Sequence, residues 1–210
     1  MRISWISDSG IRIETSQGLI MYNHTSDVLT SSSQKDENTI LIFSGESEKE
    51  ACSSKISDNS KSIYEAGEYE IHGIPIQGFP VKINQDEINV PSIVYSLTAE
   101  GMNICIVNNI NNITIPAAVS ESMGKIDILC LLANSNSENT LESVNSLVSQ
   151  LDPSILAPIE ILSSSDVTEI YPKLTKELGQ TVEEPISRAA VSKSGLQDAL
   201  KVLNLKKLTE

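Results

Sequence analysis

The chain has 210 residues, a hydrophobic content of 40% and a formal net charge of −13. A chain of this length buries about 70% of its unfolded surface, so it can fold without disulfides or metals. The acidic charge argues against a nucleic-acid partner, because phosphate binding requires clustered Lys and Arg, and it argues equally against an anionic membrane surface.

The cysteines and the apolar runs indicate a reducing, cytoplasmic setting. There are three cysteines and no CxxC spacing. Cys105 and Cys130 lie inside apolar runs, where cysteine behaves as a small hydrophobic residue. No N-terminal signal is visible, and the longest apolar run, Ile128–Ala133, is too short to span a bilayer.

The first part of the sequence is dominated by short strand patterns. Met1–Ile13 alternates and predicts a hairpin, and Leu19–Tyr22 predicts a third strand. The Ser-rich stretch 25–38 predicts a surface loop or a short helix. Thr39–Phe43 is typical of a buried strand, and the polar segment Ser44–Glu50 after it predicts a loop. A buried strand that ends in a polar loop is a common place for a chemical site.

More strands are predicted in the middle of the chain. Ser62–Phe79 reads as strands broken by glycines, and Val81–Asn89 is interpreted as a polar connection. Ser92–Leu97 and Met102–Val107 predict two strands joined by a tight hairpin turn.

The last third alternates strands and helices. Apolar residues at spacings of three and four predict amphipathic helices. The predicted strands are Ile126–Leu132, Ile155–Ile161 and Ala189–Val191, and the predicted helices are Glu138–Leu151 and Val167–Leu178, the latter capped by Gly179. Leu196–Leu205 fits either a helix or a strand.

This order of elements predicts an α/β chain with two sheets rather than one doubly wound sheet. No internal repeat and no linker is visible in the sequence. We therefore expect one domain over residues 1–210.

Three segments resemble the metallo-β-lactamase-fold hydrolases, in particular the small branch near the ascorbate-phosphate lactonases. They are Ile3-Ser-Trp-Ile-Ser-Asp-Ser-Gly-Ile-Arg-Ile13, Ala66-Gly-Glu-Tyr-Glu-Ile-His-Gly-Ile74 and Gly101-Met-Asn-Ile-Cys105. The resemblance covers nearly the whole chain. It implies a four-layer αβ/βα sandwich, with two facing mixed β-sheets and helices on the outside.

The resemblance also implies where a metal would bind. In this family the strand that ends near Phe43 is followed by Ser-His-x-His-x-Asp-His, whose side chains hold one or two zinc ions that generate a hydroxide nucleophile. Here the same place reads Ser44-Gly45-Glu46-Ser47-Glu48-Lys49-Glu50. All three histidines are missing, and Lys49 puts a positive charge where the family has an aspartate.

The remaining ligand positions differ as well. The residues that stand there, in chain order, are Asp8, Asn23, Asn109 and Glu160. The chain has only two histidines, so no shift of the alignment restores the set. His24 is interpreted as a turn residue beside Asn23, and His72 as a solvated turn residue.

Two functions from different classes remain. The first is a non-catalytic relative, without cofactor, that acts as a binding or assembly module for an unknown protein partner or for a second copy of itself. The second is a hydrolase that holds Mg²⁺, Mn²⁺ or Ca²⁺ among Asp8, Asn23, Glu46, Glu50, Asn109 and Glu160. The loss of every histidine ligand favours the first, so the sequence leans against an enzyme.

Overall fold

The computed structural model describes residues 1–7, 10–23, 38–53, 56, 60–85, 88–108, 110, 113–133, 140–161 and 169–208. Within these ranges the strands form two mixed sheets. The six-stranded sheet has the order β13-β1-β2-β3-β4-β5, with bounds Ala189–Ala190, Arg2–Ser7, Gly10–Glu14, Leu19–Tyr22, Thr39–Ile42 and Lys61–Ile63. Strands β3, β4 and β5 run parallel, whereas β1, β2 and β3 are antiparallel neighbours.

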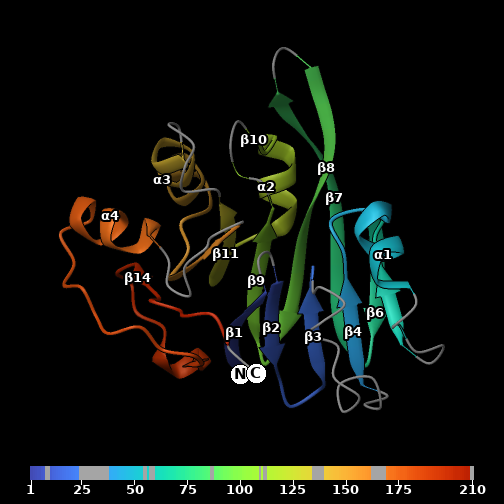
Figure 1. The fold of residues 1–210 in the computed structure, drawn as a ribbon, viewed down its shortest axis with the longest axis horizontal. Coiled ribbons are helices and arrows are strands. Elements are labelled where there is room, and N and C mark those ends of the chain that lie inside the picture. Colours follow the sequence, from blue (N-terminus) through green and yellow to red (C-terminus); the bar gives the residue numbers. More distant parts are fainter. Residues whose placement is uncertain are drawn as a thin grey trace.

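The eight-stranded sheet has the order β10-β7-β8-β9-β11-β12-β14, and β6 also pairs with β7. The strand bounds are Gly67–Ile71 (β6), Ile74–Gln85 (β7), Ile88–Ala99 (β8), Met102–Val107 (β9), Ile113–Thr114 (β10), Ile128–Ala133 (β11), Ile155–Glu160 (β12) and Lys201–Val202 (β14). Strands β7 and β8 form a long hairpin that projects beyond the rest of the molecule (Figure 1).

A single apolar cluster joins the two sheets. It includes Trp5 and Ile13 from one sheet and Tyr95 and Ile104 from the other, together with Leu205 from the C-terminal segment. These side chains alternate with outward residues along each strand, as a half-buried strand requires. The alternation in the sequence therefore corresponds to the interior of the sandwich.

Helices cover the outer faces of both sheets. Helix α1 (Glu46–Cys52) packs Cys52 on the outer face of the six-stranded sheet, against Met21 and Phe43. Helices α2 (Ala117–Met123), α3 (Thr140–Leu151) and α4 (Ile170–Glu177) pack against the outer face of the eight-stranded sheet. The four layers of the αβ/βα sandwich are thus present, and the expected fold class is confirmed. No helix in the described ranges is both long and apolar enough to cross a membrane.

Asp127 is a charged residue directly before the apolar strand β11, and its contacts explain why it is there. Its carboxylate is 4% exposed and accepts hydrogen bonds from the Asn103 N–H at 2.9 Å and from Lys193 Nζ at 2.8 and 2.9 Å. Lys193 opens the short 3-10 helix η2 (Lys193–Gly195). The pair therefore fastens the C-terminal segment to the sheet, and a charged partner satisfies the buried carboxylate.

Two predictions of local structure were wrong. Ser44–Glu50 is a loop only at its first two residues, because helix formers with acidic residues in the first turn begin α1 at Glu46. The segment predicted as a connection, Val81–Asn89, belongs to β7 up to Gln85 and to β8 from Ile88, and Val81 and Ile83 are buried on alternate positions; residues 86–87 lie outside the described ones.

The segment Leu196–Leu205 was left undecided between helix and strand. It forms only the short strand β14, whose Lys201 and Val202 pair with Ile155 and Leu156. The predicted helices Glu138–Leu151 and Val167–Leu178 are present as α3 and α4, with residues 138–139 and 167–168 outside the described ones, and Gly179 follows α4 with a φ of +64°. The stretch 25–37 lies outside the described residues.

Candidate functional site

The candidate positions follow the carboxyl ends of strands in both sheets. Asn23 comes directly after β3, and Ser44 follows β4. Because β3 and β4 are parallel, their ends lie at one edge of the sheet. Glu160 is the last residue of β12, which runs parallel to β11. Asp8, His24 and Asn109 lie outside the described residues.

Asn23 binds the loop that follows the neighbouring strand. The Ser44 N–H donates to its Oδ1 at 2.7 Å, and its Nδ2 donates to Ser44 Oγ at 3.1 Å. Asn23 is 5% exposed and has a φ of +42°, a left-handed conformation that asparagine tolerates better than most residues. Both ends of its carboxamide are therefore engaged within the protein.

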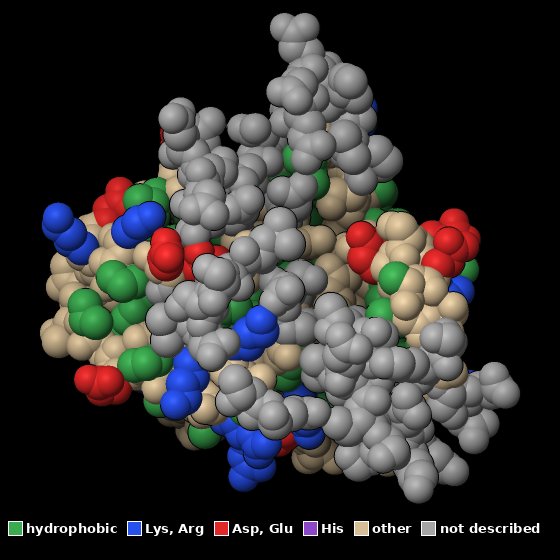
Figure 2. Space-filling model, in the orientation of Figure 1, with side chains coloured by type: hydrophobic (Ala, Val, Ile, Leu, Met, Phe, Trp, Pro, Cys, Tyr) green, Lys and Arg blue, Asp and Glu red, His purple; other side chains and the backbone are tan. Residues whose placement is uncertain are grey.

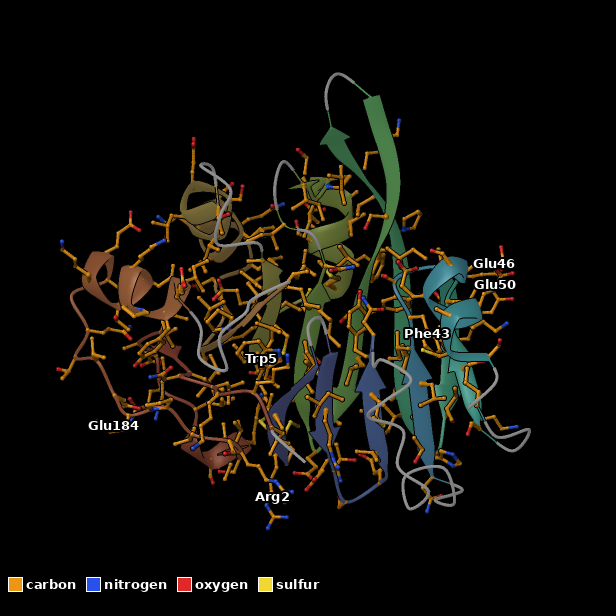
Figure 3. All side chains as sticks on the ribbon, viewed as in Figure 1. Arg2, Trp5, Phe43, Glu46, Glu50 and Glu184 are labelled. Atoms are coloured by element: carbon orange, nitrogen blue, oxygen red, sulfur yellow. The ribbon has the colours of Figure 1, made fainter. Side chains whose placement is uncertain are left out.

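The positions that correspond to the family's histidine motif lie at the start of α1. Gly45 precedes the helix, and Glu46, Ser47 and Glu50 are exposed on it. Figure 3 shows Glu46 and Glu50 projecting away from the body of the molecule. Ser47 Oγ donates to the neighbouring Glu48 carboxylate at 2.8 Å. These side chains do not point toward a common centre.

Gly45 does not require a glycine backbone. Its φ is −175°, which is extended backbone that any residue adopts. A Cβ atom placed there would meet only the carboxylate tip of Glu48, at 3.2 Å. The backbone at this position would therefore accept a histidine, so Gly45 differs from the family's residue in its side chain and not in a backbone conformation that requires glycine.

Lys49 does not occupy the metal position that the family's aspartate implies. Its ammonium lies 3.8 Å from the centroid of the Tyr64 ring, a cation–π contact. Tyr64 packs against the apolar cluster on the outer face of the six-stranded sheet. The expectation that Lys49 places its charge in the pocket was wrong, because α1 turns this side chain toward Tyr64.

Glu160 is a buried carboxylate with a structural contact. It is 2% exposed, and the backbone N–H of Glu169 donates to its Oε2 at 2.6 Å. Glu169 directly precedes α4, so the carboxylate accepts a hydrogen bond from the start of that helix. The helix dipole favours a negative charge at this end.

Tyr22 is a polar residue of the site that the sequence did not single out. It ends β3 beside Asn23 and is fully buried, with its ring edge-to-face against Tyr95 at 6.2 Å. Burial raises its pKa well above the usual tyrosine value, and Tyr95 and the Glu48 carboxylate add to the effect. Tyr22 is therefore protonated at neutral pH and cannot serve as a phenolate base or nucleophile.

The cysteines offer no nucleophile either. Cys52, Cys105 and Cys130 are all buried, and none of them forms a disulfide. Burial raises the pKa of Cys130 to about 12, and that of Cys105 is raised further. Thiols in such surroundings are inert, because the thiolate is the reactive form.

No metal cluster is evident in the part of the chain that the structure describes. There, His, Cys, Asp and Glu side chains do not gather in groups of three or more that could hold an ion. His72 is exposed in the turn between β6 and β7. A surface hollow of about 540 Å³ is lined by Met1, Glu14, Glu100 and Ser192 among others, but by none of the candidate residues.

We expect Asn23→Ala to lower the free energy of unfolding by about 2 kcal/mol. The change removes two hydrogen bonds to Ser44 and forces alanine into a left-handed conformation. Urea unfolding measures the loss. Asn23→Gly is the matched control: it keeps the backbone conformation available and should recover part of the stability. Equal losses for both variants would show that the conformation of residue 23 contributes nothing.

Comparisons with known proteins agree with this architecture. Residues 2–160 match the family model described as "Beta-lactamase superfamily domain". A sequence comparison with curated proteins found no match.

Solved structures extend the likeness over nearly the whole chain. A metallo-β-lactamase-superfamily protein from Thermotoga maritima is 13% identical, with a TM-score of 0.68 over 98% of this chain and 99% of its own. A protein from Parabacteroides distasonis, described as a metal-dependent hydrolase, is 16% identical, with a TM-score of 0.61 over 97% and 93%. The isothiocyanate hydrolase of a Delia radicum gut bacterium is 10% identical, with a TM-score of 0.58 over 99% and 98%.

At these identities the structures show a shared fold. The family model covers well over half of the chain, and the two-sheet architecture agrees with it. The histidine motif of the family is absent from residues 44–50. The chain belongs to the metallo-β-lactamase superfamily and lacks the superfamily's metal-binding motif.

Proposed function

We propose that this protein is a non-catalytic member of the superfamily that acts as a binding or assembly module for a protein partner or a second copy of itself. The observation that carries the proposal is that the residues at the positions of the family's histidine motif, all of them among the described residues, do not form a metal site. Gly45, Ser47 and Glu50 supply no imidazole, and Lys49 contacts Tyr64. A zinc site needs several imidazole, thiolate or carboxylate ligands around one point.

The internal contacts at the other positions support the same function. Asn23 is bonded to Ser44, and Glu160 accepts a hydrogen bond from Glu169. Polar groups that are satisfied inside the protein contribute to folding rather than to substrate binding. The fold, with its large buried core, is meanwhile intact. Retention of a framework without its ligands fits selection for a folded surface.

A cytoplasmic location belongs to this proposal. The three cysteines are buried and form no disulfide, as suits a reducing compartment.

The competing hypothesis is a hydrolase that uses Mg²⁺, Mn²⁺ or Ca²⁺. One observation favours it: Glu160 is a buried carboxylate at the end of a strand where the family has a metal ligand. Carboxylate oxygens are the ligands that hard cations prefer. Under this hypothesis Glu160 would share an ion with Asp8 and Asn109, which lie outside the described residues.

The metal content of the purified protein separates the two hypotheses. We expect elemental mass spectrometry, after dialysis without chelator, to find less than about a tenth of an equivalent of zinc, manganese, iron, calcium or magnesium. About one equivalent of a hard cation, lost in Glu160→Gln, would overturn the non-catalytic function. Glu160→Gln is preferred to alanine because the amide oxygen can still accept from the Glu169 N–H.

A further inference from the structure

The outer face of the six-stranded sheet is divided into two parts. Helix α1 packs on the part formed by β3 and β4. On β1 and β2 the core-facing residues are Ile3, Trp5, Ile11 and Ile13. Their neighbours Arg2, Ser4, Arg12 and Glu14 therefore face outward. Ile6 of β1 still belongs to the apolar cluster under α1, and Leu208 packs against that cluster, so the second part is confined to these four residues and their neighbours.

The C-terminal segment adds two more cations to the same face. Ala189 pairs with Ile3, and Leu205 belongs to the core between the sheets. Arg188 directly precedes β13, and Lys206 lies between Leu205 and Lys207, the residue that pairs with Trp5. Both side chains are exposed. Lys206 is tied there by its N–H, which donates to the Ile186 carbonyl at 2.9 Å. We call Arg2, Arg12, Arg188 and Lys206 the cationic strip.

The cationic strip is poorly neutralised. Among the described residues it forms ion pairs with Glu14, which lies 3.0 Å from Arg12 and 3.6 Å from Arg2. Arg188 and Lys206 are exposed, and no carboxylate of the described residues forms an ion pair with either. Figure 2 shows Lys and Arg side chains gathered on the lower part of this face. Such a cluster is unexpected on a chain with a net charge of −13.

The hydroxyl of Ser4 lies within the strip and lacks an acceptor. Ser4 is 1% exposed, and its Oγ has no hydrogen-bond partner among the described residues. A buried hydroxyl without a partner costs about 1–3 kcal/mol. A hydroxyl this buried is out of reach of a partner, so the donors that the strip presents to acceptor groups are those of its exposed side chains Arg2, Arg188 and Lys206.

The opposite charge occurs on α1 of the same chain. Glu46, Glu48 and Glu50 are exposed, and Lys49 is held against Tyr64. Figure 3 shows Glu46 and Glu50 at the right of the view, away from Arg2 of the strip at the bottom. A molecule thus carries a cationic surface and a separate acidic surface, which cannot meet within one copy without rearrangement.

We propose that the cationic strip binds the acidic helix α1 of a second copy. Complementary charges give such a contact its orientation and its dependence on salt. Because the two surfaces differ, the contact is head-to-tail, and it produces rings or chains rather than a symmetric dimer. This inference rests on the proposed function, because it assumes that the fold is kept for binding. It adds the identity of the partner, which is a second copy of the chain.

A second copy fits the strip better than a nucleic acid does. A duplex carries a charge about every 1.7 Å and would extend past the strip onto the acidic remainder of the surface. Helix α1 offers a compact group of carboxylates over five residues, a rise of about 6 Å. Neighbouring strands lie about 4.8 Å apart, so Arg12 and Arg188, on the two sides of β1, are about 10 Å apart, a span that long Arg and Glu side chains can bridge.

Analytical ultracentrifugation of the full chain tests this proposal. We expect concentration-dependent association at about 0.1 M NaCl that weakens at least tenfold at about 0.5 M, because added salt screens exposed charges. The variant R188E/K206E should weaken association at least tenfold, and so should E46K/E50K. The control K82E/K125E changes the net charge by the same amount at exposed lysines outside the strip, and it should associate as the wild type does.

Mixing the two variants gives the decisive result. The mixture uses charge-neutral versions, because two charge-reversed surfaces would attract each other. R188A/K206A keeps an intact α1 and E46Q/E50Q keeps an intact strip, so together they should form a 1:1 complex that grows no further. A wild type that stays monomeric up to about 1 mM, or a control that loses association equally, would overturn the proposal. Metal content measured on the same samples tests the non-catalytic function separately.

Discussion

Trp5→Ala should lower the free energy of unfolding by about 3–5 kcal/mol, a large part of the stability of a typical domain. Trp5 is fully buried in the cluster between the two sheets. It also lies in β1 where that strand pairs with Ile11 of β2 and with Lys207 of the C-terminal segment. The substitution leaves a cavity at a junction of three chain segments, which cannot collapse without moving the strands.

Urea unfolding followed by far-ultraviolet circular dichroism is the suitable measurement, because Trp5 is the only tryptophan and its fluorescence is lost. Trp5→Phe keeps an aromatic ring and should lose less than half as much stability. Val182→Ala, at a position that is 61% exposed, should change stability by less than about 0.5 kcal/mol. A loss below about 1 kcal/mol for Trp5→Ala would mean that the sheets do not close over this residue.

Local patterns predicted most of the fold. Strands such as Leu19–Tyr22 and Met102–Val107 were placed correctly, because their residues alternate or form apolar runs bounded by turns. The prediction that the two sheets pack face to face came from the resemblance to the family rather than from the periodicity of the sequence. The start of α1 was missed because seven residues anchored by one buried cysteine carry little helical periodicity.

The contacts of the candidate site could not be predicted in the same way. The absence of histidines was plain from the sequence. It gave no sign that Asn23 would bind Ser44, that Lys49 would lie over Tyr64, or that Glu160 would contact Glu169, since these depend on side-chain directions.

The cationic strip escaped sequence analysis for a different reason. The sequence was interpreted as having no basic cluster. Arg2, Arg12, Arg188 and Lys206 come from segments up to 204 residues apart in sequence numbering, and only the pairing of β1 with β2, β13 and residue 207 brings them together. A short stretch of sequence contains at most two of these four residues, so no local excess of positive charge is visible in the sequence.

Returning the family's side chains to α1 should restore zinc binding. In the variant G45H/S47H/K49D/E50H, we expect zinc to rise from below about a tenth of an equivalent to about one. Gly45 has an extended backbone with room for a side chain, apart from the flexible tip of Glu48. Ser47 and Glu50 are three residues apart on a helix and so lie on one side of it.

The same variant removes the features that oppose a cation. K49D replaces an ammonium by a carboxylate and gives up a cation–π contact that contributes about 0.5–1 kcal/mol at an exposed site. Elemental analysis gives the zinc stoichiometry, and Co²⁺ substitution reports the coordination geometry from its visible absorption. G45A/S47A/K49A/E50A is the matched control, because it alters the same four positions without adding ligands and should bind no zinc.

The zinc stoichiometry of this variant decides whether the protein lacks a metal site because of its side chains alone or because of its backbone as well. Zinc binding by the restored variant means that the backbone at the ends of β3, β4 and β12 still has the superfamily's geometry, and that side chains alone separate this protein from a metal site. A folded variant that binds no zinc would mean that Asn23, Tyr22 and Ser44 have drawn the loop into a different arrangement. In that case Glu160→His added to the four changes would also fail, because a further ligand cannot compensate for a displaced loop.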